Sequence, residues 1–312
     1  NKLFSAALLA AFSFATLEAG AVPAKRGVRQ YKQPDGSMVN VTLHGDENFH
    51  YYLTADNMPL MEDADGALYF ATVENGKLQK TKYLACDASM RSAELKATIA
   101  GTKTSDVVSA LRAKALNSGR RNADSHVGLG KFSTTFPTKG EQKALVILVE
   151  YKDVKFKIDN PKQYFTDMLN KDGFSEYGAT GCARQYFLDA SNGQFDLTCD
   201  VYGPVTLSNN RSYYGGNGLS GHDRQPEEMV IEAVKQLDPT VDFSQYDRDK
   251  DGILDNVFLF YAGKGEASGG SADTVWPHAW NLEQAGKSFS VDGVLVDHYA
   301  CTCELQGTKP DG

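Results

Sequence analysis

The chain has 312 residues, a length that corresponds to about two domains of ordinary size. Hydrophobic residues make up 41% and charged residues 23%, as in a typical globular protein, so the composition excludes a globally disordered chain. The formal net charge is -8 and no dense run of basic residues occurs, which argues against a nucleic-acid partner.

The first 21 residues have the three-part pattern of a secretory signal peptide. Lys2 precedes an apolar stretch from Leu3 to Leu17, and Ala19-Gly20-Ala21 follows as a small-x-small cleavage site. The apolar stretch is shorter than the roughly 20 residues that cross a bilayer, so a signal peptide is favoured over a transmembrane anchor. We therefore expect a secreted protein without a membrane span.

Residues 22–118 are predicted to form a small unit that is rich in β-structure and ends in a helix. Residues 27–85 alternate apolar and polar side chains between turn signals such as Pro34-Asp35-Gly36, which is typical of antiparallel strands. A helix is predicted from about Ser105 to Leu116. Residues 119–140 are rich in Gly, Ser, Asn and basic residues and indicate a linker. Its Arg120-Arg121 pair suits proteolytic removal of a pro-segment, or is simply two solvated charges.

From Lys143 onward the pattern becomes α/β. The run "ALVILVEY" is continuously apolar, as expected for a strand covered on both faces. Asn160-Pro161 predicts the start of a helix to Asn170, and further helices are predicted from about Ala179 to Ala190 and from Pro226. Further strands are predicted at "FDLTCDV", "PVTL", "NVFLFYAG" and "VLVDHYACTCEL".

The sharpest local motif is the acidic loop from residue 247 to residue 255. Carboxylates occupy loop positions one, three, five and nine, which are Asp247, Asp249, Asp251 and Asp255. Position six is Gly252, and position seven is Ile253, which offers its carbonyl. This is the pattern of a calcium loop. Phe258 occupies position twelve instead of the usual bidentate Glu, so this is not a regular helix-loop-helix hand. A solvated acidic turn is the alternative, but four like charges this close would repel without a counter-ion. We predict Ca²⁺ binding.

The other candidate residues are histidines and cysteines. Trp276 and His278 are candidates for one wall of a substrate cleft, although a packed core or surface histidine is the more ordinary explanation. His298 lies near Cys301 and Cys303, but the spacing matches no standard zinc knuckle and favours buried strand thiols. No His-x-x-x-His pair, Gly-x-Ser-x-Gly elbow or phosphate-binding loop occurs. Five cysteines are too few for a disulfide framework, although one bridge is possible.

Several segments in order resemble the catalytic domain of immune-inhibitor-A-like metalloproteases: "KALVILVEYKDVKF", "ARQYFLDASNGQFDLTCDVYGPVTL", "YYGGNG", "DFSQYDRDKDGILDNVFLFYAG" and "TVWPHAW". The resemblance covers residues 140–312, and "HGDENFHYYLTADNMPLMEDADGALYFATVENGKL" is similar to the pro-region that precedes such domains. The resemblance implies a signal peptide (1–21), a β-rich pro-region (22–118), a linker (119–140) and the first part of a zincin-like mixed sheet with packed helices (141–312).

The resemblance also implies the activity. Members are secreted zinc endopeptidases, in which zinc polarises the peptide carbonyl while the Glu of a His-Glu-x-x-His helix accepts a proton from water. That helix is expected after Gly312, so we assign no catalytic residue or zinc ligand to this chain and expect it to be inactive alone. The rival hypothesis is a secreted, calcium-stabilised binding or adhesion module on a scaffold that has lost catalysis. A His-Glu-x-x-His sequence beyond Gly312 would distinguish the two.

Overall fold

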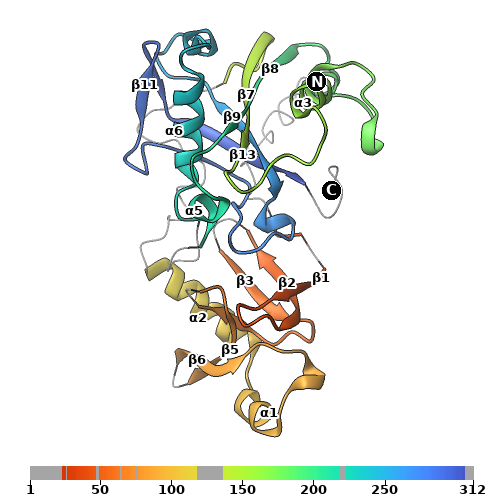
Figure 1. The fold of residues 1–312 in the computed structure, drawn as a ribbon, viewed down its shortest axis with the longest axis vertical. Helices are drawn as coiled ribbons and strands as arrows, with labels where there is room; N and C mark the ends of the chain where they lie inside the picture. The colour runs from red at the N-terminus through yellow and green to blue at the C-terminus, as the bar shows by residue number, and fades with distance from the viewer. Residues whose placement is uncertain are drawn as a thin grey trace, which may run out of the picture.

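The computed structural model describes residues 23–25, 27–46, 49–63, 65–74, 76–117, 136–217 and 223–305. The predicted signal peptide and residues 119–135 of the predicted linker lie outside the described residues. Figure 1 shows two units, one above the other. The N-terminal unit runs from strand β1 to helix α2, and the C-terminal unit runs from strand β7 to strand β13.

The N-terminal unit contains two antiparallel sheets of three strands each, as the alternation of its sequence predicts. One sheet has β1 (Val28–Lys32), β2 (Met38–Gly45) and β3 (His50–Thr54) in that order, and the other has β4 (Leu60–Glu62), β5 (Leu68–Glu74) and β6 (Lys77–Leu84). Residues Val39, Val41 and Leu43 alternate with more exposed neighbours along β2 and enter one core with Leu60, Leu68 and Phe70.

Three short helical segments complete the N-terminal unit: η1 (Ala88–Met90), α1 (Ala93–Ile99) and α2 (Thr104–Asn117). Helix α1 begins where the Ser92 side chain accepts a hydrogen bond from the Leu95 amide, which satisfies one free donor of the first turn. Buried Leu95 and Ile99 attach this helix to the core of the sheets. A second helix in this region was not predicted, because α1 has only two buried positions.

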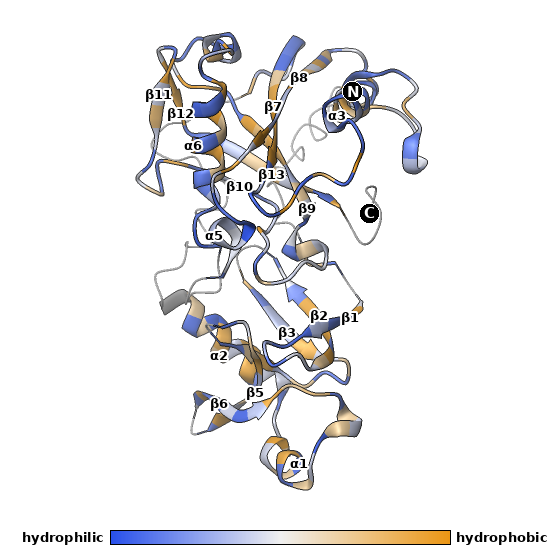
Figure 2. Cartoon of the chain, in the orientation of Figure 1, coloured by the Kyte–Doolittle hydropathy of each residue, from blue (hydrophilic) through white to orange (hydrophobic). Residues whose placement is uncertain are grey.

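The C-terminal unit is built on a mixed sheet of five strands in the order β10-β13-β9-β7-β8. These are β7 (Gly140–Glu150), β8 (Phe195–Thr206), β9 (Val257–Lys264), β10 (His278–Asn281) and β13 (His298–Leu305). Strand β10 is antiparallel to β13, and the other neighbours are parallel. The hairpin β11 (Phe289–Val291) and β12 (Val294–Val296) lies beside this sheet. Figure 2 shows the apolar run along strand β7, which lies between β9 and β8.

Helices cover both faces of this sheet. Residues Ile147 and Val149 point to the core shared with α6 (Pro226–Leu237), while Val146 and Leu148 point to the core shared with α3 (Pro161–Asn170). This placement confirms the prediction of a buried strand from the "ALVILVEY" run. The remaining helical segments are α4 (Ala183–Ala190), α5 (Arg211–Gly215), η3 (Glu176–Gly178), η4 (Phe243–Tyr246) and η5 (Glu266–Ser268).

The two units meet where strands β1 and β3 face η5 and the segment that leads to β10. Ala267 and Trp276 come from the C-terminal unit but pack into the hydrophobic core of the N-terminal unit. The Lys25 amide also donates to the Ala267 carbonyl at 2.8 Å. Within the described ranges, no helix is both long enough and apolar enough to cross a membrane.

Candidate functional site

The acidic loop connects η4 to strand β9 and folds back on its own carboxylates. Carboxylate oxygens of Asp247, Asp249 and Asp255 lie within 4.8 Å of one another. Asp251 is not in this group, and its Oδ1 accepts a hydrogen bond from the Ile253 amide at 2.8 Å. Asp247 in turn accepts hydrogen bonds from the amides of Asp251 and Gly252 at 3.1 and 3.0 Å. Lys250 and Gly252 have φ angles of 61° and 87°, so the chain turns sharply here. Three of the four predicted carboxylates therefore converge.

Asp255 is the buried member of this group. Its side chain is 4% exposed, Oδ2 accepts from the Arg248 amide at 3.2 Å, and Oδ1 has no hydrogen-bond partner among the described residues. Burial, together with the charges of the neighbouring loop carboxylates, raises the pKa of Asp255 to about 6. A buried carboxylate oxygen without a donor beside two further carboxylates is a donor set that suits a hard cation.

The loop is anchored to the hairpin that follows β10. The Leu254 amide donates to the Leu295 carbonyl, and the Leu295 amide donates to the Gly252 carbonyl, each at 2.9 Å. Ile253, whose carbonyl is the predicted ligand at loop position seven, lies between these two attachments and forms a bridge with Leu295. The second half of the loop is thus held by strand β12, which fixes its backbone relative to the sheet.

Trp276 and His278, the predicted cleft residues, are both buried in this structure. His278 is 4% exposed, with Nδ1 2.6 Å from the Trp276 carbonyl and Nε2 2.8 Å from the Tyr299 hydroxyl. The Trp276 ring is 3% exposed and stacks on His50 of the N-terminal unit with centroids 4.6 Å apart. A cleft role for these residues stays a prediction, and it requires the N-terminal unit to move away from Trp276.

His298 and the predicted strand thiols lie on β13. Cys301 and Cys303 are buried on the face that packs toward α6, and all five cysteines are free thiols. Within the described part of the chain, the acidic loop is the one place where three potential metal ligands converge. The histidines described here therefore do not build a zinc site.

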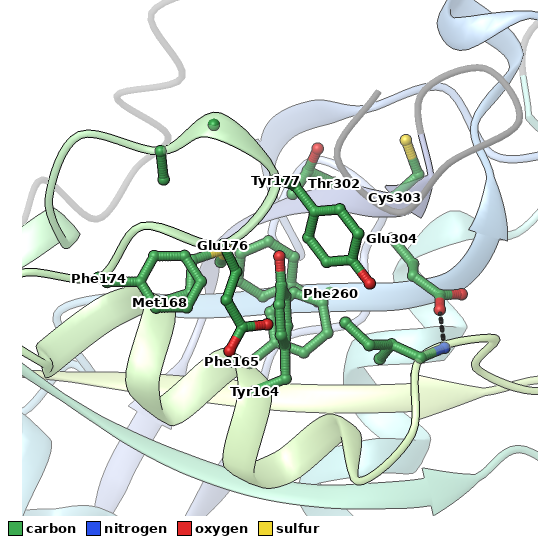
Figure 3. A pocket seen from close by; sticks show the side chains of 13 residues that line it. Tyr164, Phe165, Met168, Phe174, Glu176, Tyr177, Phe260, Thr302, Cys303 and Glu304 are labelled. Atoms are coloured by element: carbon green, nitrogen blue, oxygen red, sulfur yellow. Dashed lines mark hydrogen bonds between the residues drawn. The ribbon is translucent and has the colours of Figure 1, made fainter.

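A separate pocket of about 400 Å³ opens on the opposite face of the sheet, between α3, η3 and β13. Figure 3 shows the rings of Tyr164, Phe174 and Tyr177 gathered around it, with Phe260 on its floor. Glu304 lies at its edge, but this carboxylate accepts hydrogen bonds from the amides of Lys157, Ile158 and Gly263 at 2.6–2.9 Å. Its oxygens are used by the backbone, so Glu304 has a structural role.

Sequence reasoning missed a polar cluster at the contact between the units. Glu266 in η5 is fully buried, and its Oε1 accepts a hydrogen bond from Tyr52 at 3.2 Å and lies 3.5 Å from His50 Nε2. Glu62 at the end of β4 lies in the same region and lines a cavity with residues of the C-terminal unit. No local signal marks these residues, since Glu62 ends a short strand, Glu266 begins a short helical turn, and neither belongs to a recognisable motif.

Comparison with known proteins gives the family. The model of the immune inhibitor A peptidase M6 catalytic domain matches residues 131–293, slightly more than half of the chain. The chain belongs to this M6 peptidase family. The match includes β7, α6, the acidic loop and β9, and it ends in the β11–β12 hairpin, so the family resemblance noted in the sequence is confirmed.

Two curated relatives each align with about half of the chain. The chain is 28% identical over 186 residues to the pre-pro-metalloprotease PrtV of Vibrio cholerae, an alignment that covers 48% of this chain and 20% of that protein. It is 28% identical over 188 residues to immune inhibitor A of Bacillus thuringiensis subsp. alesti, covering 49% of this chain and 27% of the relative. The alignments thus span only a fifth to about a quarter of these relatives.

Proposed function

We propose that this chain is the first part of a secreted, zinc-dependent endopeptidase precursor that hydrolyses peptide bonds in proteins. The observation that carries the proposal is the match of the M6 catalytic-domain model to residues 131–293. The names of the two relatives, a pre-pro-metalloprotease and immune inhibitor A, support the same class of activity. The apolar leader of residues 3–17 supports secretion.

The proposal assigns a role to each segment. Residues 1–21 are the signal peptide, residues 22–118 the pro-region, residues 119–140 the linker and residues 141–312 the first part of the catalytic domain. The contact between the units supports this division, because the N-terminal unit covers Trp276 and stacks His50 on its ring. In this precursor the pro-region occupies a surface of the catalytic domain.

Zinc is expected of a member of this family, but the histidines described here do not form a site for it. His278 uses both ring nitrogens in contacts with Trp276 and Tyr299 and lies within a core. We therefore derive no catalytic step through zinc from these residues. The C-terminal unit contributes a rigid sheet and, once the N-terminal unit is removed, one wall of a substrate cleft, which carries Trp276.

We also propose that the acidic loop binds Ca²⁺. Carboxylates of Asp247, Asp249 and Asp255 supply the first oxygens, and the Ile253 carbonyl and Asp251 are further candidates. Calcium at this position would compensate the like charges between η4 and β9. Its role would be to stabilise the loop that leads into β9 and is attached to β12, without direct contact with substrate.

Peptidase assays of two forms of the protein test the proposed activity. The chain 1–312 is expected to leave casein intact, because it contains no His-x-x-x-His ligand pair. The complete natural product of the gene, after removal of its pro-region, is expected to cleave casein and to lose this activity with a zinc chelator. If purified 1–312 cleaves casein and a zinc chelator abolishes this cleavage, the expectation that the chain is inactive alone is wrong. Inactivity of the complete product would favour a calcium-stabilised binding or adhesion module.

A further inference from the structure

A fully buried carboxyl group, that of Glu266, and a half-buried one, that of Glu62, lie where the two units meet and have few hydrogen-bond donors. Glu266 is fully buried, and its Oε2 has no hydrogen-bond partner among the described residues. The same holds for Oε1 of Glu62. Taking an ionised carboxylate out of water without donors is strongly unfavourable, so the pair does not rest in this contact as two ordinary anions.

The groups that face Glu266 do not neutralise it by a direct ion pair with arginine. Arg29 on β1 directs Nη1 to the backbone carbonyl of Glu266 at 3.3 Å rather than to its carboxylate. Tyr52 and His50 on β3 contact Oε1, while Asp223 adds a negative charge from the C-terminal unit. Burial, followed by the charges of Glu62 and Asp223, raises the pKa of Glu266 well above its ordinary value.

The surroundings of Glu62 carry charges of both signs, because the cavity beside it is lined by Asp63, Asp65 and Asp273 and also by Arg29, Lys32 and Arg224. Asp65 from the N-terminal unit and Asp273 from the C-terminal unit both disfavour its charged form, whereas the polar side chains of Tyr31 and Asn217 favour it. Burial is the largest cause, and the pKa of Glu62 is raised from 4.5 to about 7. A cavity of about 500 Å³, bounded by both units, lies beside this carboxyl.

The two units contribute different members of this cluster. The N-terminal unit, the lower one in Figure 1, contributes Glu62, His50, Tyr52 and Arg29, and the C-terminal unit contributes Glu266. Separation of the units would therefore hydrate both carboxyls. We propose that the N-terminal unit is held on the C-terminal unit by a proton-dependent contact, closed while Glu62 and the His50–Glu266 pair carry protons and weakened when they lose them. If this contact regulates activation of a protease, that role rests on the proposed function. The proton-dependent contact itself does not rest on it.

The direction of the pH dependence follows from the protons that the closed form holds. One proton keeps the His50–Glu266 pair neutral overall, whether it resides on the imidazole or on the carboxyl. For Glu62 the pKa in the closed form is higher than in water, so its contribution is fully present below about 4.5 and is lost as the pH rises through about 7. Between these two pH values, each carboxyl group that must be protonated in the closed form lowers the equilibrium constant for closing by up to about tenfold per pH unit.

Trp276 reports the state of this contact, because its ring stacks on His50. The chain has two tryptophans, and the variant W280F leaves Trp276 as the single emitter. We expect acrylamide quenching of Trp276 to increase severalfold between pH 5 and pH 9, while far-UV circular dichroism stays constant. Quenching that is unchanged over this range would overturn the proposal.

Carboxyl-to-amide variants in the W280F background give the second arm. E62Q and E266Q each remove a titrating group and keep its shape, so we expect Trp276 to remain protected to higher pH than in the parent. E94Q is the matched control, since Glu94 lies exposed on α1 in an ion pair with Lys82, and its pH profile should equal that of the parent. An E62Q profile identical to the parent would overturn the proposal. If E266Q fails to fold, the parent and E62Q decide the question. No readout requires peptidase activity, so this test and the casein assay can fail independently.

Discussion

At the scale of single residues, Asp255 is the buried carboxylate of the acidic loop and the member of that loop that most needs a counter-ion. Asp255 lies at the buried end of the acidic loop. One of its oxygens has no hydrogen-bond partner among the described residues, and the carboxylates of Asp247 and Asp249 lie within 4.8 Å. Asp249 belongs to the same group but is exposed to water. Loss of Asp249 should therefore remove a metal ligand at little cost to the metal-free fold, whereas a change at Asp255 would also alter the core.

Calcium is expected to raise the thermal stability of the chain through this loop. Free calcium at 100 times the dissociation constant should stabilise the folded state by about 2.7 kcal/mol, because the ion binds only the folded loop. D249N should lose most of this gain, and D238N, an exposed aspartate just after α6, should retain it. Differential scanning calorimetry with calcium and with a chelator measures the effect. Identical melting curves under the two conditions would rule out this role.

The acidic loop and the contact cluster differ in how far the sequence predicts them. The loop is local, since alternate residues of a tight turn converge, and spacing alone indicated Asp247, Asp249 and Asp255. Spacing could not show that Asp251 lies outside the converging group, or that backbone amides donate to the carboxylates of both Asp247 and Asp251. The Tyr52–Glu266 hydrogen bond joins residues 214 positions apart, and no periodicity within either segment encodes such a pairing.

At the scale of elements, the sequence predicts best where one segment carries its own complete signal. Strand β7 is apolar on both faces, and α3 begins at Pro161 and α6 at Pro226, as predicted. The predicted break between "FDLTCDV" and "PVTL" is wrong, because β8 continues from Phe195 to Thr206. Its pairing with β7 only shifts register between Ile147 and Val149, which accommodates Gly203-Pro204 without ending the strand.

Helix α6 should stabilise the C-terminal unit mainly through its buried face. Met229 is fully buried against the sheet, and the Tyr151 hydroxyl lies 3.4 Å from its sulfur. Met229→Ala would leave a cavity and is expected to lower the free energy of unfolding by about 2–5 kcal/mol. Met90→Ala is the matched control, because Met90 is 75% exposed and should change stability by less than about 0.5 kcal/mol. Chemical denaturation measures both, and equal effects would contradict this packing.

At the scale of the whole molecule, the arrangement of the two units is what the sequence left open. Alternation and turn signals predict a β-rich first unit, and the apolar runs after Lys143 predict a second. Neither predicts that Ala267 and Trp276 pack into the core of the first unit. The units therefore share apolar surface as well as the Glu62–Glu266 cluster, and removal of a pro-region would require both to separate.

The shared surface predicts that the units stay together after the linker is cut. A site for a specific protease inserted between residues 119 and 135 would break the only covalent connection, since all five cysteines are free. At pH 5.5, where Glu62 stays protonated in the contact, the two pieces should co-elute in size-exclusion chromatography with the uncut protein as the reference. At pH 8.5 a fraction of the N-terminal piece should elute separately, because ionisation of Glu62 opposes its burial while the apolar contact remains. Complete separation at pH 5.5 would mean that the packing around Trp276 is too weak to hold a pro-region in place.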